Sequence, residues 1–199
     1  TAEIVRPIVI GEQRLLRSVA LGDERELNIW LPPSYARSGK SYPVLYLIDG
    51  ALDQDFHHIA GLAQYGALSW SFEELIVVGV QTKDRRAELT WRSTDAAEIR
   101  DFPTNGNSAA FRKFLTDEVK PLIETNYRTS GEDALMGESL AGLFVAESFL
   151  KHPGTADRYI AISPSLWWDF GSLGKEARGR LDGYPKGERK LYLAIANEN

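Results

Sequence analysis

Five short apolar runs, separated by polar or helix-forming stretches, constrain the fold of this chain more than any other feature. Strands that are apolar on both faces are typical of parallel sheets covered by helices on each side. Their alternation with helical stretches predicts an α/β fold with a mostly parallel central sheet. The runs are 42–48 (YPVLYLI), 75–80 (LIVVGV), 133–136 (DALM), 159–162 (YIAI) and 191–196 (LYLAIA).

The first thirty residues have a different pattern, which predicts antiparallel strands. Strands are expected over 3–10, 14–21 and 26–31, with turns at Gly11-Glu12 and Gly22-Asp23. Within the third strand, alternate residues face opposite sides of the sheet.

Two stretches show clear helical signals. Residues 108–127 place Phe111, Leu115, Val119 and Leu122 on one apolar stripe, with Ser108 as the expected N-cap. Pro121 inside that stretch is expected to kink or divide the helix. A second helix is expected over 140–151, ended by the sequence His-Pro-Gly at 152–154.

Composition excludes several classes of function. The 199 residues contain no cysteine, which removes disulfides, thiolate metal sites and a cysteine nucleophile. The net charge of −5, without a basic run, argues against nucleic acid as a partner. No apolar run reaches the ~18–20 residues of a membrane span, and no cluster has metal-ligand spacing.

Length predicts one domain over residues 1–199. The chain starts with Thr1 and shows no leader, so an exported and a cytoplasmic protein both remain open. Oligomeric state has no signal in the sequence.

The segment that carries chemistry is Gly137-Glu138-Ser139-Leu140-Ala141-Gly142, between an expected strand and an expected helix. This G-x-S-x-A pattern is one methyl group away from the nucleophile elbow G-x-S-x-G. The small residues at 137 and 141 allow the strand and helix backbones to approach closely. Ser139 would then project over the sheet, with the Leu140 N–H as an oxyanion donor. The alternative is a serine that merely caps the helix.

A second oxyanion donor is expected from the loop after an earlier strand. Asp49-Gly50-Ala51 follows the run 42–48, and the Ala51 N–H is the candidate donor. The alternative is an ordinary turn that ends a strand.

The chain resembles the putative-esterase family of the α/β-hydrolase superfamily, nearest to its siderophore (enterochelin-type) esterases and related to esterase D and feruloyl esterases. The resemblance rests on segments spread from about residue 25 to the end. It implies an α/β-hydrolase fold, a serine nucleophile at Ser139, an oxyanion hole at Ala51 and Leu140, and ester hydrolysis without a cofactor. The segments are RELNIWLPPSY (25–35), YPVLYLIDG (42–50), Asp84-Arg85 with 88–90, FLTDEVKPLIETNYRT (114–129), GESLAG and AISPSLWWD (161–169).

Two positions of the elbow depart from the family pattern. Relatives usually carry histidine, asparagine or glutamine at the place of Glu138, and glycine at the place of Ala141. A carboxylate facing the nucleophile would oppose a developing oxyanion, so Glu138 is expected to point toward solvent.

The histidines are the larger departure, because a serine needs a base to become a nucleophile. His152 is expected more than ~15 Å from Ser139, at the far end of the same helix. His57 and His58 follow the 49–51 loop and are interpreted as binding or structural groups, although one of them could substitute as base. We favour a third hypothesis, a C-terminally incomplete chain that lacks the last helix and the base-bearing loop. Glu198 is the candidate acid, or else a terminal residue without a role.

Substrate contacts are predicted from loops at the carboxyl ends of the strands. Arg85, with Arg86 and Arg92 nearby, suits an anionic or catecholate-like group. Trp167 and Trp168 could stack on an aryl group, and His58 lies near the expected mouth of the site. Surface charge, for the arginines, and packing beneath a cap, for the tryptophans, are the alternatives.

These observations lead to two hypotheses of different class. The first is a serine carboxylic-ester hydrolase that acts on a small-molecule ester, with siderophore, feruloyl-type and small acyl esters all open. The second is a non-catalytic, hydrolase-shaped binding protein whose catalytic triad has decayed.

Overall fold

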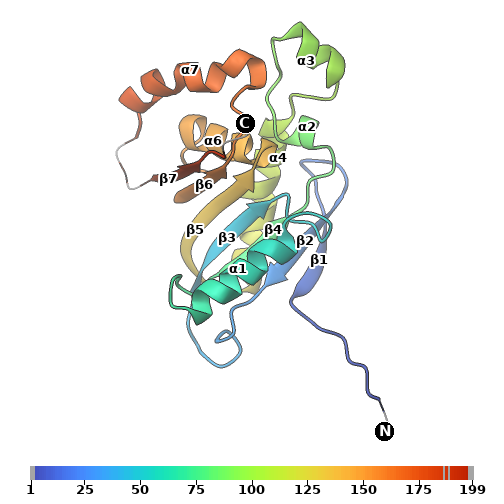
Figure 1. Cartoon of the computed structure of the whole chain (residues 1–199). Helices are drawn as coiled ribbons and strands as arrows, with labels where there is room; N and C mark the ends of the chain where they lie inside the picture. The colour runs from blue at the N-terminus through green and yellow to red at the C-terminus, as the bar shows by residue number, and fades with distance from the viewer. Residues whose placement is uncertain (1–2, 186, 188, 197–199) are drawn as a thin grey trace.

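A computed structural model describes residues 3–185, 187 and 189–196. These residues form a seven-stranded sheet in the order β1-β2-β4-β3-β5-β6-β7 (Figure 1). The strands are β1 (Glu12–Arg17), β2 (Glu24–Trp30), β3 (Tyr42–Ile48), β4 (Ile76–Val80), β5 (Thr129–Glu138), β6 (Arg158–Ile162) and β7 (Lys190–Ala194). The helices are α1 (Phe56–Leu68), α2 (Arg85–Glu88), α3 (Ala96–Asp101), α4 (Ser108–Phe114), the π-helical turn η1 (Leu115–Val119), α5 (Lys120–Asn126), α6 (Leu140–Lys151) and α7 (Trp168–Asp182).

The sheet is mixed in the way that the sequence predicts. β1 pairs antiparallel with β2, and β2 pairs antiparallel with β4. The pairs formed by β3 with β4 and β5, and then by β5, β6 and β7, are all parallel. Because parallel strands end at one edge of a sheet, the loops after β3, β4, β5, β6 and β7 gather at that edge.

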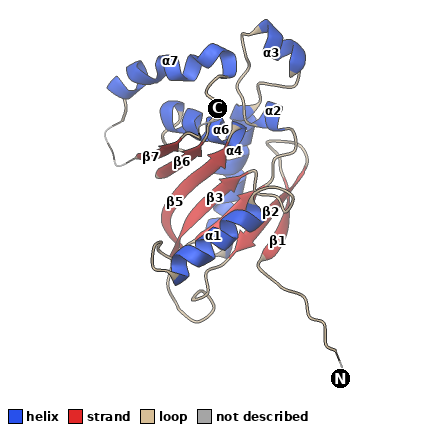
Figure 2. Cartoon of the chain, in the orientation of Figure 1, coloured by secondary structure: helices blue, strands red, loops and turns tan. Residues whose placement is uncertain are grey.

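Helices cover both faces of the sheet (Figure 2). On one face α1 packs Phe56 and Ile59 against Leu45 and Val77. On the other face α4, η1, α5 and α6 contribute a larger core, in which Phe111, Phe114 and Phe144 are fully buried. The two apolar layers explain why β3 and β4 are buried along almost their whole length.

The helix expected over 108–127 is divided, as Pro121 predicts. α4 passes into η1, and α5 carries Pro121 in its first turn, where a missing N–H is tolerated. The expected N-cap was wrong. Asn107 holds that position, and the Ser108 hydroxyl instead donates to Glu147 of α6 over 3.1 Å. A buried acceptor therefore prevails over the local capping preference of serine.

The predicted strand over 3–10 was also wrong. The segment forms no strand, and Ile4, Val5, Ile8 and Val9 are between 75% and 92% exposed. β-Branched residues favour a strand only where a neighbouring strand satisfies their backbone and covers their side chains. The second strand is shorter than expected and spans Glu12–Arg17.

Among the described residues, no helix combines the length and the apolar composition that crossing a bilayer requires.

The fold brings the loop after β3 against the backbone of β4. A Cβ atom added at Gly50 would lie 2.2 Å from the Gly79 Cα and 2.5 Å from the Val80 nitrogen. The Gly50 N–H also donates to the Val80 carbonyl over 3.0 Å. The loop that carries Ala51 therefore keeps its path only with glycine at position 50.

We predict that Gly50→Ala lowers the free energy of unfolding by about 3 kcal/mol, because two backbone segments must separate. Urea denaturation measures the change. Gly61→Ala on α1 is the matched control, since a Cβ there meets nothing within 4 Å and alanine favours a helix. Equal stability of the two variants would contradict the close-approach argument.

Candidate active site

The turn between β5 and α6 has the geometry of a nucleophile elbow. Ser139 has φ 58° and ψ −117°, a conformation that L-residues rarely adopt, and its side chain is exposed. A Cβ at Gly137 would lie 2.6 Å from the Ala141 carbonyl carbon, so this position requires glycine. Glu138 is exposed, as expected from the sequence.

Backbone hydrogen bonds with the end of β6 and with the loop after it hold the elbow. The Ser139 N–H donates to the Ile162 carbonyl over 3.0 Å, and the Ser165 N–H donates to the Ser139 carbonyl over 3.0 Å. The Ser165 hydroxyl lies 3.3 Å from the Ser139 hydroxyl. The sequence alone does not identify Ser165, because its proximity to Ser139 depends on the pairing of β5 with β6.

The two predicted oxyanion donors differ in their surroundings. Leu140 is the first residue of α6, so its N–H has no carbonyl one turn earlier in the helix to bond. The Ala51 N–H, by contrast, donates to Gln54 Oε1 over 3.0 Å. Gln54 is held in turn by Thr82, to whose carbonyl its amide donates over 3.0 Å. Leu140 therefore offers a donor at the pocket, whereas Ala51 must exchange its partner before it can bind an oxyanion.

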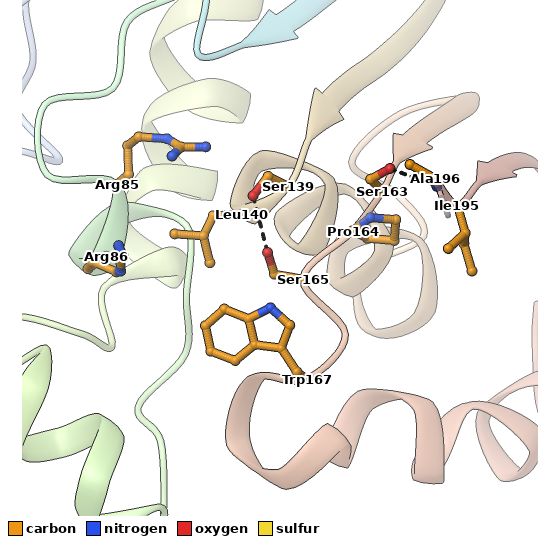
Figure 3. Close-up of a pocket in the computed structure, with 10 residues that line it drawn as sticks. All are labelled: Arg85, Arg86, Ser139, Leu140, Ser163, Pro164, Ser165, Trp167, Ile195 and Ala196. Atoms are coloured by element: carbon orange, nitrogen blue, oxygen red, sulfur yellow. Dashed lines mark hydrogen bonds between the residues drawn. The ribbon is translucent and has the colours of Figure 1, made fainter. Parts of the chain in front are cut away.

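A cavity of about 310 Å³ opens beside Ser139 (Figure 3). The loops after β4, β5, β6 and β7 all contribute to it, as expected for the carboxyl edge of the sheet. Among the described residues that line it, none is acidic and none is histidine. They are Arg85, Arg86, Ser139, Leu140, Ser163, Pro164, Ser165, Trp167, Ile195 and Ala196.

Arg85 and Arg86 of α2 form one wall of the pocket, the arginine wall, and ion pairs hold α2 in place. Glu88 of α2 is buried and forms an ion pair with the buried Arg25 of β2, with contacts of 2.7 and 2.9 Å. Arg85 Nε donates to Asp49 over 2.8 Å. Arg85 therefore reaches the pocket but is already paired with the loop that carries Ala51.

The two tryptophans have separate environments. Trp167 lines the pocket and is 56% exposed, so it is placed as predicted. Trp168 is fully buried and donates from Nε1 to the Trp91 carbonyl over 3.1 Å. The structure does not bring Trp168 to the pocket, and packing, the alternative interpretation, fits its position.

Asp169, which directly follows these tryptophans, joins the two walls of the pocket. Its buried carboxylate accepts from the Thr94 N–H at 2.8 Å, the Thr94 hydroxyl at 2.7 Å and Trp91 Nε1 at 3.1 Å. The Asp169 N–H donates to Glu98 of α3 over 3.0 Å. Asp169, Phe170 and Gly171 all have positive φ. A backbone in this strained conformation persists because its surroundings fix it.

Burial alone would raise the pKa of Asp169, but the hydrogen bonds from Thr94, Trp91 and Ser172 outweigh it and lower the pKa to about 2. The carboxylate is therefore ionised throughout the neutral range. Its lowered pKa in the folded state stabilises the protein above the ordinary value of 3.8, and this stabilisation is lost as the pH falls toward 2.

The histidines lie apart from the pocket lining. His57 and His58 are exposed on α1, and the structure does not bring His58 to the cavity. His152 ends α6, as expected, and lines a separate cavity of about 360 Å³. Burial and then Arg112 lower the pKa of His152. Glu198 lies outside the described residues.

Among the described residues, no three or more histidine, aspartate or glutamate side chains are grouped so that they could hold a metal ion. The arrangement at the pocket is a serine hydroxyl, a helix N–H, two guanidinium groups and an exposed indole.

The strand order and the strand–turn–helix geometry at Ser139 together define an α/β-hydrolase fold. The family model described as Putative esterase matches residues 18–189, and the chain belongs to this family. The family predicted from the sequence motifs is therefore confirmed.

Three known proteins illustrate the similarity. Uncharacterized protein YbbA of Bacillus subtilis is 27% identical over 87% of this chain and 68% of its own length. Ferri-bacillibactin esterase BesA of Bacillus subtilis is 37% identical, over 35% of this chain and 25% of its own length. The crystal structure of an IroE-like serine hydrolase from Shewanella oneidensis is 30% identical with a TM-score of 0.84, over 94% of this chain and 61% of that chain.

We predict that Asp169→Asn lowers the free energy of unfolding at pH 7 by about 2 kcal/mol, the free energy equivalent of the lowered pKa. In the variant an NH2 group replaces one carboxylate oxygen. This NH2 group would face N–H and O–H donors and could not accept their hydrogen bonds. The difference in free energy of unfolding between Asp169→Asn and the parent protein should be smaller at pH 3. At that pH the lowered pKa of the Asp169 carboxylate contributes less to the stability of the parent protein. Urea denaturation at both pH values measures it.

Asp182→Asn, an exposed aspartate near the end of α7, is the matched control and should change stability little. If Asp169→Asn were as stable as this control, Asp169 would not join the walls of the pocket.

Proposed function

We propose that this protein is a serine hydrolase that cleaves carboxylic esters through an acyl-enzyme at Ser139. The observation that carries the proposal is the strained, exposed Ser139, which lines a cavity and lies directly before the N-terminus of α6. Two relatives support it, since BesA is named an esterase and the Shewanella structure a serine hydrolase. This chain covers 25% of BesA and 61% of the Shewanella protein, so ester hydrolysis by this chain is our proposal.

The geometry suggests how the reaction proceeds. Ser139 Oγ attacks the ester carbonyl carbon, and the Leu140 N–H donates to the oxyanion that forms. Loss of the alcohol leaves an acyl group on Ser139 Oγ, and water then releases the acid. The Ser139 proton must pass to a base, and no histidine lines the pocket among the described residues. The proposal therefore rests on the nucleophile and the oxyanion donors.

The walls of the pocket suit a flat, polar ester. Trp167 presents an exposed indole face for an aryl group, and the arginines of α2 present donors for oxygen atoms. Siderophore-type esters fit this description, and relatives such as BesA and a siderophore enterobactin esterase of Emericella nidulans bear names of that kind. Siderophore-type or aryl esters are therefore the proposed substrates.

One observation favours the second candidate, a binding protein without catalysis. The Ala51 N–H is already bonded to Gln54 Oε1, so one of the two oxyanion donors is occupied. In such a protein the pocket would still bind an ester but would leave it intact.

A fluorophosphonate probe distinguishes the two candidates, because it reacts with an activated serine. We predict that the probe labels Ser139, as identified by mass spectrometry of the labelled peptide. Ser139→Ala should remove the label and lower kcat/KM for a 4-nitrophenyl ester at least about a thousand-fold. The fold should be retained, as judged by circular dichroism.

Ser130→Ala, an exposed serine at the opposite end of β5, is the matched control and should label and hydrolyse like the parent protein. A folded parent protein that takes no label at Ser139 would overturn the esterase proposal in favour of the binding protein.

A further inference from the structure

The two arginines of α2 that line the pocket are chemically different. Arg85 is neutralised, because its guanidinium makes two contacts of 2.8 Å with the buried carboxylate of Asp49. Asp49 is itself fixed, since it also accepts a hydrogen bond from the Thr82 hydroxyl. Arg85 therefore holds the loop after β3 in place, although the sequence alone predicts it as a substrate contact.

Among the described residues, Arg86 has no such ion-pair partner. None of the ion pairs among the described residues involves it, and its Nε is buried without a hydrogen-bond acceptor. Its guanidinium carbon lies 4.0 Å from the centroid of the Phe102 ring. An aromatic face attracts the cation but accepts no directed hydrogen bond in the guanidinium plane. The terminal Nη donors of Arg86, which make no hydrogen bond among the described residues, therefore remain available to an acceptor that enters the pocket.

The position of Arg86 is fixed by its backbone. The Arg86 N–H donates to Asp84 Oδ1 over 3.1 Å, and the Arg86 carbonyl accepts from the Thr90 hydroxyl over 2.5 Å. Two acidic residues lie two positions from Arg86 in sequence, and both are engaged elsewhere. The Asp84 carboxylate accepts from the N–H groups of Arg86 and Ala87, and Glu88 is paired with Arg25. The Phe102 ring then backs the guanidinium, so little side-chain freedom is left to lose on binding.

The other residues that line the pocket determine which ligand group can bind the Arg86 guanidinium. Trp167 exposes a flat indole to the same cavity, and Figure 3 shows Arg86 and Trp167 around the space in front of Ser139 and Leu140. No acidic side chain among the described residues lines the cavity. A planar anion with two oxygen atoms matches the fork of guanidinium donors, as a carboxylate does.

We propose that Arg86 makes the pocket selective for esters that carry a carboxylate. This inference rests on the proposed function, since Arg86 would orient the ester whose carbonyl Ser139 attacks. Arg86 holds the carboxylate through its N–H donors, while Arg85 remains bound to Asp49 and supports the loop of Ala51.

A matched pair of substrates tests the proposal. 4-Nitrophenyl pentanoate and the mono-4-nitrophenyl ester of glutaric acid have acyl chains of equal carbon number, and the second ends in a carboxylate where the first ends in a methyl group. The measured quantity is selectivity, the ratio of kcat/KM for the glutarate ester to kcat/KM for the pentanoate. We expect Arg86→Gln to lower this ratio about ten-fold to a hundred-fold, the effect of a lost charge-assisted hydrogen bond. Arg86→Lys should retain part of the selectivity.

Arg100→Gln is the matched control, because it removes the same charge from the exposed surface of α3. Its ratio should equal that of the parent protein, which excludes an effect of net charge. If Arg86→Gln leaves the ratio unchanged, or lowers both rates equally, the proposal is overturned although Ser139 still hydrolyses esters. A folded parent protein that cleaves neither ester and takes no fluorophosphonate label would instead overturn the proposed function, and this inference with it.

Discussion

The close approach of β5 and α6 is the constraint on which the site depends. Because Gly137 has no Cβ, the first turn of α6 can pack directly against the end of β5. Ser139, between the two elements, adopts a φ of 58°. That conformation exposes the serine side chain and sets it directly before the first N–H of α6. A serine with an ordinary φ could cap the helix, but its hydroxyl would then turn back toward the backbone.

A strained corner persists only where its surroundings hold it. Here Ser139 makes one backbone hydrogen bond with the last residue of β6 and one with Ser165 in the loop that follows, and this loop leads into Trp167 and Asp169. Asp169 then binds the segment after β4 through Thr94 and Trp91. The nucleophile, the indole wall and the arginine wall are in this way parts of one hydrogen-bonded unit, which explains how loops can keep a pocket in shape.

Local pattern was sufficient to predict the sheet, α6, the division of the helix at Pro121 and the elbow itself. These features depend on periodicity, proline geometry and small residues at fixed spacing, which are all visible in a single segment. Features that depend on two distant segments escaped prediction. The strand expected over 3–10 has the right residues but no neighbouring strand. Arg85 and Arg86 are adjacent and alike in sequence, and only Asp49 and Phe102, brought in by the fold, distinguish them.

The central claim is that the Ser139 hydroxyl and the Leu140 N–H act on the same ester carbonyl. The most direct measurement is a crystal structure of the protein after reaction with a phosphonate ester. The account predicts phosphorus bonded to Ser139 Oγ, with a phosphonyl oxygen within hydrogen-bond distance of the Leu140 nitrogen. A crystal that shows Ser139 unmodified, or a phosphonyl oxygen directed away from α6, would contradict it.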